Sequence, residues 1–520
     1  MKTFLIGLFS FTSVALFGQK QPSDKVFCTQ SREESLIPIR PGVPGKQPFW
    51  NEKAKLFKHA PSFKNNKIRE VIPVKYRYSA FSFTDKQYYT FTDSSGTQSL
   101  APIWKQLPNG NVSLKIEGIS KEGFVCLALD RTFYKAATFC PPYPDAKYSY
   151  KEALLKGLKF FYNQNYIKEW YSTGSPNHIE MPLYSYSAKI ISSVIDGMLL
   201  YNKYFPKNDS ALIIARKAAD YLIAKAEPEG SKLEYFSQTY EGTNLAANLY
   251  NKEILMSEPA WTGTTFLHLY DKTKDKKYFT AAVNIANTYI KNQLPSGTWY
   301  IRVNKETGKP ASPILCIPNT IINFLSILVN KYNLVQYKPN IRDAFKWIMD
   351  NPEKTFDWTG QFEDVAANSQ YQNLSHYEAS WFAMRLLDLK ERDSSDIRMA
   401  KELIAFCEDQ FIVWERPDIY DDRNVLSNEW HVPAALEQYH CYLPIDASTD
   451  QMIFMFCKAY KTTGDPIYRA KAIALANSIV NCQKEDGQIP TFLYPFRKDN
   501  FWPNCMMYSL KMLDQMSTLK

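Results

Sequence analysis

The sequence predicts a mainly α-helical protein that is built from repeated helical hairpins and preceded by a small β domain. Three observations support this prediction. One stretch of the chain occurs twice, the apolar residues from residue 145 onward have helical spacing, and an earlier region alternates apolar and polar residues in short runs. Repeated helical units are typical of a solenoid or a closed ring.

The repeated stretch reads TKDKKYFTAAVNIANTYIKNQLPSG from Thr273 and TGDPIYRAKAIALANSIVNCQKEDG from Thr463. Counted from Asp275 and from Asp465, both copies place Tyr at +3, Ala at +7, Ala-Asn at +11 and +12, Gln at +18 and Gly at +22. A looser third copy begins at Asn208. We expect each copy to form one helix from its Asp or Asn to its Gln.

The N-terminal segment MKTFLIGLFSFTSVALFG, residues 1–18, has a lysine, an apolar core and small residues near its end. This pattern is typical of a signal peptide, so we expect an exported protein that is periplasmic or secreted. No later run reaches the roughly 18 apolar residues that a membrane helix needs, and we expect no membrane insertion. Residues 19–66 carry Pro, Lys and Gly with little periodicity, which indicates a linker or wrapping arm.

Residues 67–140 predict the small β domain. Runs such as NVSLKIEGI and GFVCLALD are short, alternate with period two and contain many β-branched residues. Turn sequences such as Ser-Ser-Gly and Lys-Glu-Gly separate these runs. We expect them to form a β-sandwich-like domain.

The region 145–520 follows a Pro-Pro-Tyr-Pro break and is predicted to be helical to its end. The repeat supplies the phase for six pairs of helices. The predicted first helices are 150–168, 209–226, 275–293, 339–351, 396–412 and 465–482. The predicted second helices are 184–203, 259–272, 317–332, 376–390, 448–461 and 503–516. Short connections alternate with long ones at 169–183, 227–258, 294–316, 352–375, 413–447 and 483–502.

Twelve helices in six hairpins, together with the segment LYDKTKDKKYFTAAVNIANTYIKNQLPSG, resemble the six-hairpin glycosidase-like superfamily. The resemblance covers residues 149–516 and implies a closed (α/α)6 toroid with a carbohydrate-active site. That superfamily includes glycoside hydrolases, unsaturated-uronyl hydrolases, polysaccharide lyases and sugar epimerases. The matching residues are packing and turn residues, so the resemblance does not choose among these reactions.

The six long connections emerge at one end of such a ring, and long loops on a rigid scaffold are where chemistry concentrates. Hydrolysis of a glycosidic bond usually needs two carboxyl groups, one on each side of the bond. We therefore expect Glu429 and Asp364 to face each other across an active cleft. Glu241 is a further carboxyl candidate, and His431 supplies a group that titrates near neutral pH. Glu258, before Pro259, is expected to lie at the start of a helix, where its negative charge interacts favourably with the helix dipole.

Aromatic residues make up 15% of the chain, and sugar rings present apolar faces that stack on aromatic side chains. Several aromatic and basic residues lie in or beside the long connections and are expected to bind substrate. They are Tyr240, Trp299, Trp358, Trp430, Tyr439, His440, Arg497 and Trp502.

The formal net charge is +9, and without residues 1–18 it is +8, because that segment carries one Lys and no acid. This charge favours neutral or anionic partners such as uronate glycans. Nucleic acid is disfavoured because no binding motif is present. The six histidines are scattered without a metal-binding spacing, and we expect neither a metal nor a cofactor.

Two alternatives to hydrolysis remain open. In the first, a base removes the proton next to a uronate carboxyl, which makes the protein a lyase or a C5-epimerase. The residues available for that reaction are Tyr439, His440, His431, Asn368, Arg302 and Arg497. In the second alternative, the protein binds glycans without catalysis.

Overall fold

The computed structural model describes residues 74–94, 100–123, 125–135, 137–354, 357–364, 374–416, 430–438, 441–494 and 501–519. The chain divides into two compact units, Met1–Lys135 and Ala136–Lys520. The predicted signal peptide, 1–18, and the predicted arm, 19–66, lie outside the described residues.

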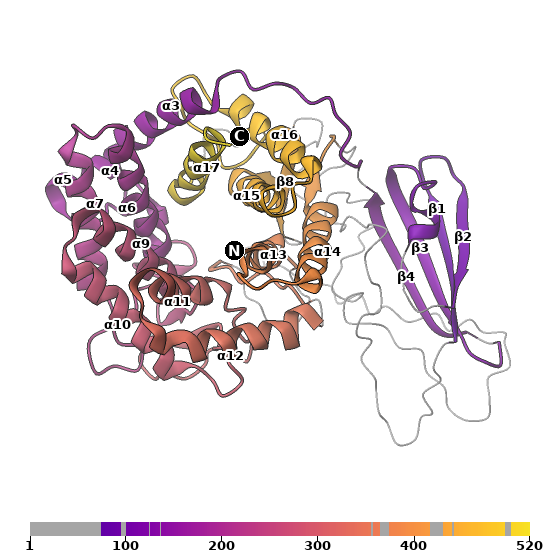
Figure 1. Cartoon of the computed structure of the whole chain (residues 1–520), viewed down its shortest axis with the longest axis horizontal. Helices are drawn as coiled ribbons and strands as arrows, with labels where there is room; N and C mark the ends of the chain where they lie inside the picture. The colour runs from indigo at the N-terminus through magenta and orange to yellow at the C-terminus, as the bar shows by residue number, and fades with distance from the viewer. Residues whose placement is uncertain are drawn as a thin grey trace. The chain divides into compact units, whose positions relative to one another are not determined.

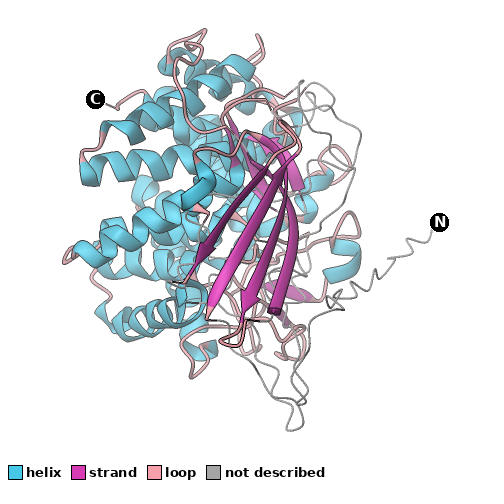
Figure 2. Ribbon diagram, turned by 90° about the vertical axis from the view of Figure 1, so that its right-hand side faces the viewer, coloured by secondary structure: helices cyan, strands magenta, loops and turns pink. Residues whose placement is uncertain are grey.

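The first unit contains an antiparallel sheet of four strands in the order β2-β1-β3-β4, which Figure 2 shows as one twisted layer. The strands are β1 (Lys75–Ser82), β2 (Tyr88–Asp93), β3 (Gly110–Ile119) and β4 (Val125–Lys135). Alternate residues such as Tyr78, Ala80 and Leu114 are fully buried on one face. The short helix α2 (Ala101–Trp104) brings Ile103 and Trp104 into this cluster. In the described residues a helix, and not a second sheet, therefore covers the apolar face.

The second unit is the expected (α/α)6 toroid, in which the described residues form twelve long helices in two concentric rings (Figure 1). The outer helices are α3 (Tyr150–Asn163), α7 (Asp209–Ala224), α10 (Lys276–Asn292), α12 (Lys338–Ile348), α14 (Ser394–Phe411) and α16 (Pro466–Cys482). The inner helices are α6 (Ser187–Tyr204), α9 (Glu258–Thr273), α11 (Asn319–Tyr332), α13 (His376–Asp388), α15 (Asp446–Thr463) and α17 (Pro503–Met516). The last inner helix, α17, packs against both α15 and α6, so the ring is closed.

The repeated Asp or Asn caps an outer helix in all three copies. Oδ1 of Asp275, of Asp465 and of Asn208 each accepts a hydrogen bond of 3.1 Å from the backbone N–H two residues later. These caps satisfy N–H groups that have no partner within the first helical turn. The repeat therefore fixes where α10, α16 and α7 begin.

The repeated Gln joins one outer helix to the next. Nε2 of Gln293 donates to the backbone oxygen of Asn340 in α12 at 3.0 Å, and Nε2 of Gln483 donates to that of Ala153 in α3 at 2.9 Å. The second bond connects the end of the last outer helix to the first one. The same residue type thus links consecutive hairpins and closes the ring.

The repeated Gly permits a close approach between outer helices. Gly297 and Gly487 have φ of 99° and 102°, in the region that favours glycine. A Cβ atom at Gly297 would lie 2.3 Å from the backbone oxygen of Asp343, and one at Gly487 would lie 2.4 Å from that of Lys156. Any side chain at these positions would push the neighbouring helix away.

The long connections lie at the end of the ring where the inner helices begin. Two small sheets lie among them. The pairing of β5 (Glu253–Leu255) with β6 (Arg302–Asn304) joins two connections, whereas β8 (Ala434–Gln438) pairs with β7 (Ile412–Val413) and β9 (Cys441–Ile445) between α14 and α15. Short helical segments also occur between the long helices. They are α4 (Asn165–Lys168), α5 (Trp170–Thr173), η1 (Pro182–Ser185), α8 (Ala247–Tyr250), η2 (Val335–Tyr337) and η3 (Met349–Glu353). None of the helices in the described part of the chain has the length and apolar character to cross a membrane.

Candidate active site

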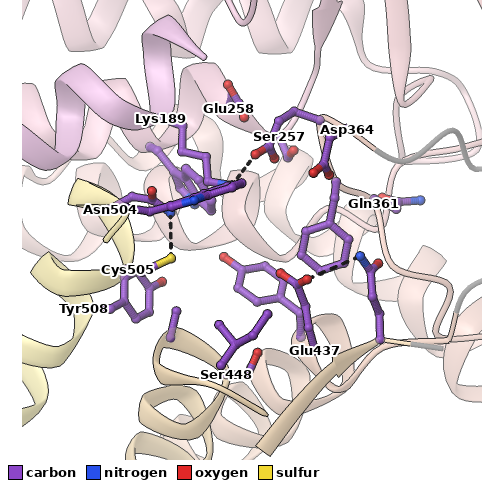
Figure 3. A pocket seen from close by; sticks show the side chains of 18 of the residues that line it. Lys189, Ser257, Glu258, Gln361, Asp364, Glu437, Ser448, Asn504, Cys505 and Tyr508 are labelled. Carbon is purple, nitrogen blue, oxygen red and sulfur yellow. Dashed lines mark hydrogen bonds and ion pairs between the residues drawn. The ribbon is translucent and has the colours of Figure 1, made fainter. Parts of the chain in front are cut away.

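The inner helices and the long connections enclose a cavity of about 350 Å³. Each of the six inner helices contributes a residue from its first turn. They are Lys189 (α6), Glu258 (α9), Thr320 (α11), Tyr377 (α13), Ser448 (α15) and Asn504 (α17). Figure 3 labels Lys189, Glu258, Ser448 and Asn504 among them. The connection before α13 adds residues 361–364, and β8 adds Glu437. A concave site with a few convergent polar groups is the usual form of a small-ligand site.

Carboxyl groups are the most frequent charged groups in the cavity wall. The described lining residues with a carboxyl side chain are Glu258, Glu363, Asp364, Glu378 and Glu437. Among the described lining residues, Lys189 is the one lysine or arginine. Its Nζ atom forms an ion pair with Oε1 of Glu363 and lies 5.7 Å from the centroid of the Trp502 ring. The positive charge of Lys189 is thus already paired within the protein.

Burial changes the protonation of several wall residues. The pKa of Asp364, a residue that keeps some solvent exposure, is raised to about 6, first by desolvation and second by the charge of Glu363, while Lys189 opposes both effects. Burial likewise raises the pKa of Glu258 well above its usual range, again with a contribution from Glu363. Burial raises the pKa of Glu378 to about 7. The cavity therefore holds carboxyl groups that keep their protons closer to neutral pH than carboxyl groups in free solution do.

The backbone of the acidic loop is held by two buried side chains from elsewhere in the ring. The guanidinium group of Arg302 donates hydrogen bonds of 3.0 Å to the backbone oxygens of Phe362 and Glu363. The Tyr240 hydroxyl donates a bond of 2.7 Å to the same Glu363 oxygen. Tyr240 was predicted to bind substrate and Arg302 to neutralise a uronate. Neither lines the cavity, and both instead position the loop that carries Asp364.

Glu437 enters the cavity wall from β8, not from an inner helix or the acidic loop. The strand that carries it, β8, is tied to the start of α13, because the hydroxyl of Ser375 donates a bond of 3.0 Å to the Glu437 backbone oxygen. The same hydroxyl oxygen caps α13 by accepting a bond of 3.1 Å from the N–H of Tyr377. One serine thus sets the position of Glu437 relative to the first turn of α13.

Two of the predicted site residues, Asp364 and Trp502, line the cavity. Three of the predicted stacking residues do not, because Trp299, Trp358 and Trp430 are 0% exposed. Nε1 of Trp299, for example, donates a hydrogen bond of 2.9 Å to a backbone oxygen of α10. These three indole rings fill the interior beneath the connections and have no exposed face for a sugar, which corrects the prediction.

Glu241 and His431 are described but do not line the cavity. Glu241 accepts a hydrogen bond from the hydroxyl of Tyr221 in α7, and His431 is exposed to solvent. The expectation that these two share one site with Asp364 is therefore not met. The remaining predicted residues lie outside the described residues; they are Glu429, Tyr439, His440 and Arg497, together with Asn368 of the lyase alternative.

Several wall residues were missed in the sequence analysis, most clearly His376, Tyr377 and Glu378 in the first turn of α13. Neither ring nitrogen of His376 has a hydrogen-bond partner in the described residues, and burial lowers its pKa to about 3, so the ring is neutral. A signal for such residues exists in the sequence. Each inner helix follows a long connection, so its first turn must lie at the end of the ring where the connections meet.

No group of three or more His, Cys, Asp or Glu side chains within the described residues has a geometry that fits a metal ion. The chemistry that the wall itself offers is proton transfer and attack by carboxyl groups in a partly enclosed space.

No protein-family model and no curated protein matches this chain. Solved structures with a similar shape include a family 76 glycoside hydrolase from a bovine Bacteroides thetaiotaomicron strain, at 10% identity over 86% of this chain and 95% of that chain, with a TM-score of 0.48. A cellobiose 2-epimerase from Spirochaeta thermophila has 11% identity over 70% and 98% of the two chains, with a TM-score of 0.48. An unsaturated glucuronyl hydrolase specific for heparin is 10% identical over 71% of this chain and 96% of that chain, with a TM-score of 0.46. A shared activity does not follow from similarity at this level.

Proposed function

We propose that this chain is an exported carbohydrate-active enzyme that hydrolyses a glycosidic bond with a pair of carboxyl groups. The observation that carries the proposal is the environment of Asp364. Its carboxyl group lines the cavity beside the Lys189–Glu363 ion pair, and burial raises its pKa to about 6. A carboxyl group that keeps its proton near neutral pH is suited to protonate the leaving oxygen of a glycosidic bond.

Glu437 is the candidate for the second carboxyl group. Its side chain is half-buried and enters the cavity from β8, whereas Asp364 enters from the connection before α13 (Figure 3). As an ionised carboxylate it would attack the anomeric carbon or activate a water molecule. Glu429, the partner predicted from the sequence, lies outside the described residues and is a candidate for the same role.

Aromatic side chains in the wall support a sugar as the ligand. Trp261, Phe362 and Trp502 are half-buried and line the cavity. A half-buried ring offers an apolar face on which the C–H face of a sugar can stack. The combination of stacking faces and carboxyl groups is the one that hydrolysis of a glycan requires.

The experiment incubates the wild-type protein with a glycan panel and follows new reducing ends and ultraviolet absorbance together. We expect new reducing ends without new absorbance, and loss of this activity in Asp364→Asn and in Glu437→Gln or Glu429→Gln. Glu152→Gln, an exposed position in the outer helix α3, is the matched control and should keep wild-type activity. Binding without turnover across the whole panel would instead support a glycan-binding protein.

One observation favours a second candidate function, a lyase or epimerase that acts on uronates. Tyr377 and Tyr508 both line the cavity, so a tyrosine base is available. Burial opposes this role, because it raises the pKa of Tyr377 well above its usual value and that of Tyr508 to about 12. A lyase would form an unsaturated product, so absorbance that appears with the wild-type protein and disappears in Tyr377→Phe would favour this candidate.

A further inference from the structure

Among the described residues, the cavity wall has no unpaired positive charge that could bind an anionic substrate. Lys189 is paired with Glu363. Arg302, behind the wall, bonds to backbone oxygens of the acidic loop and lies 3.7 Å from a carboxyl oxygen of Glu253. Arg385, in α13, donates a hydrogen bond of 3.1 Å to the backbone oxygen of Asn319. A uronate or sulfate group in the cavity would therefore lose its hydration without gaining a partner of opposite charge.

At three of the six inner helices, an acidic residue of the protein already lies at the positive end of the helix. All six inner helices begin at the cavity end of the ring, and such helix ends attract anions. The three acidic residues, each in the first turn, are Glu258 in α9, Glu378 in α13 and Asp446 in α15. These side chains occupy the positions that an anionic ligand would otherwise take.

Glu258 differs from the other wall carboxyl groups in its lack of partners. The residue is 2% exposed, and neither Oε1 nor Oε2 has a hydrogen-bond partner in the described residues. By contrast, Glu363 is bound by Lys189, and Glu378 accepts a bond of 2.8 Å from Nδ2 of Asn319. A buried carboxyl group without partners destabilises a fold, so its presence in a cavity wall indicates that a ligand supplies the missing hydrogen bonds.

We infer that the cavity selects an uncharged glycan, and that Glu258 binds two hydroxyl groups of one sugar ring. This inference rests on the proposed function, because it names the substrate class of the same site. A protonated carboxyl group accepts one hydrogen bond and donates another, which matches a pair of neighbouring sugar hydroxyls. The inference revises the expectation from the net charge of +9, which left uronate glycans open as substrates. The charge of the whole chain attracts anions over long distances, whereas the wall determines what fits inside.

The first test separates charge from linkage. Uronate polysaccharides and their carboxyl-reduced forms have the same linkages and differ only at C6, where an uncharged CH2OH group replaces the carboxylate, so a panel of such pairs compares charged with uncharged sugars. Binding is measured by calorimetry at low salt with the full-length Asp364→Asn protein, in which we expect turnover to be at least about 100-fold slower. We expect at least one reduced form to bind at least tenfold more tightly than its uronate parent. Equal or tighter binding of the uronate forms, or no binding of any reduced form, would overturn the inference.

The second test examines Glu258 itself with two variants. Glu258→Met keeps the length of the side chain and removes its polar atoms, so affinity for the uncharged glycan should fall at least tenfold. The thermal midpoint should stay the same or rise, because an unpaired buried carboxyl group is removed. Glu258→Gln should keep most of the affinity, since an amide also accepts and donates. If the Glu258→Met protein binds the glycan as tightly as the protein with Glu258, then Glu258 does not bind the sugar. The same conclusion follows if Glu258→Gln lowers the affinity as much as Glu258→Met does.

These binding tests are independent of the turnover tests. Preference for a uronate would overturn the inference and leave hydrolysis intact, whereas wild-type turnover in Asp364→Asn would overturn the proposed mechanism and leave the binding preference intact.

Discussion

Lys189 in α6 forms an ion pair with Glu363 in the connection before α13, and both side chains are nearly buried. The pair joins the first inner helix to the loop that carries Asp364. Burial disfavours the charge of Lys189, but the Glu363 carboxylate outweighs that effect and raises the pKa of Lys189. The contact therefore determines both the position and the charge of the acidic loop.

Removal of one member of this pair should destabilise the protein. Lys189→Met leaves Glu363 as a buried charge without a partner, and breaking such pairs typically costs about 3–5 kcal/mol. Urea denaturation would measure the change in the free energy of unfolding. The double variant Lys189→Met/Glu363→Gln should recover much of the loss, because no uncompensated charge remains. A single variant as stable as the wild type would mean that the pair is not formed in solution.

Asp364 should make the stability of the protein depend on pH. Its pKa is raised to about 6 from the usual 3.8, so the folded state binds the proton more tightly than the unfolded state. Below about pH 4 the group is protonated in both states and has no effect, and stability then falls as pH rises to about 6. Because Asp364 is exposed to solvent, water screens this effect, and the penalty at neutral pH is smaller than the pKa difference alone implies. Asp364→Asn should therefore be more stable than the wild type at pH 7 and equal to it at pH 3.5, as measured by denaturation.

Any side chain at Gly487, the glycine that lets two outer helices pack closely, should destabilise the protein. Gly487→Ala adds a Cβ atom 2.4 Å from a backbone oxygen of α3 at a φ of 102°. Gly464 is the matched control, because its φ is 71° but nothing lies within 4 Å of a Cβ atom there. We expect Gly464→Ala to cost about 1 kcal/mol and Gly487→Ala at least about 2 kcal/mol more. Equal thermal midpoints for the two variants would contradict the close packing of α16 and α3.

Close packing within the ring should also be disrupted by larger side chains. Ala282 in α10 and Ala476 in α16 are 0% exposed, so Ala→Leu at either position should cost about 1–3 kcal/mol through overpacking. Thermal melting of both variants would measure this effect. Unchanged midpoints in both would show that the sequence assigned the wrong helix faces to the core.

Much of the helical ring could be predicted because the repeated residues form contacts with residues nearby in the sequence. The cap at Asp275 and Asp465 bonds to a backbone N–H two residues away, and such contacts leave a pattern in the sequence. Tyr278 and Tyr468, at +3 of the two copies, are both buried, as their shared position predicted. The strand pairing of β5 with β6 joins segments far apart in the chain, and a short strand carries too little periodicity to reveal such a pairing.

The cavity wall was harder to predict, because the same residue types serve in the core and at a binding surface. Trp299 and Trp502 both lie in long connections, but the first is fully buried and the second lines the cavity. Composition alone cannot separate them. Glu258 was read as a helix terminus, and only its burial and its lack of partners distinguish it from an ordinary one.

The central claim, that Asp364 supplies the proton for glycosidic-bond cleavage, is tested most directly by the pH dependence of reducing-end release. In the wild type the rate should fall as pH rises above about 6, because Asp364 then loses its proton. Asp364→Asn should lower the rate at least about 100-fold at every pH while the protein stays folded. A variant that keeps the wild-type rate and the wild-type pH profile would contradict the account.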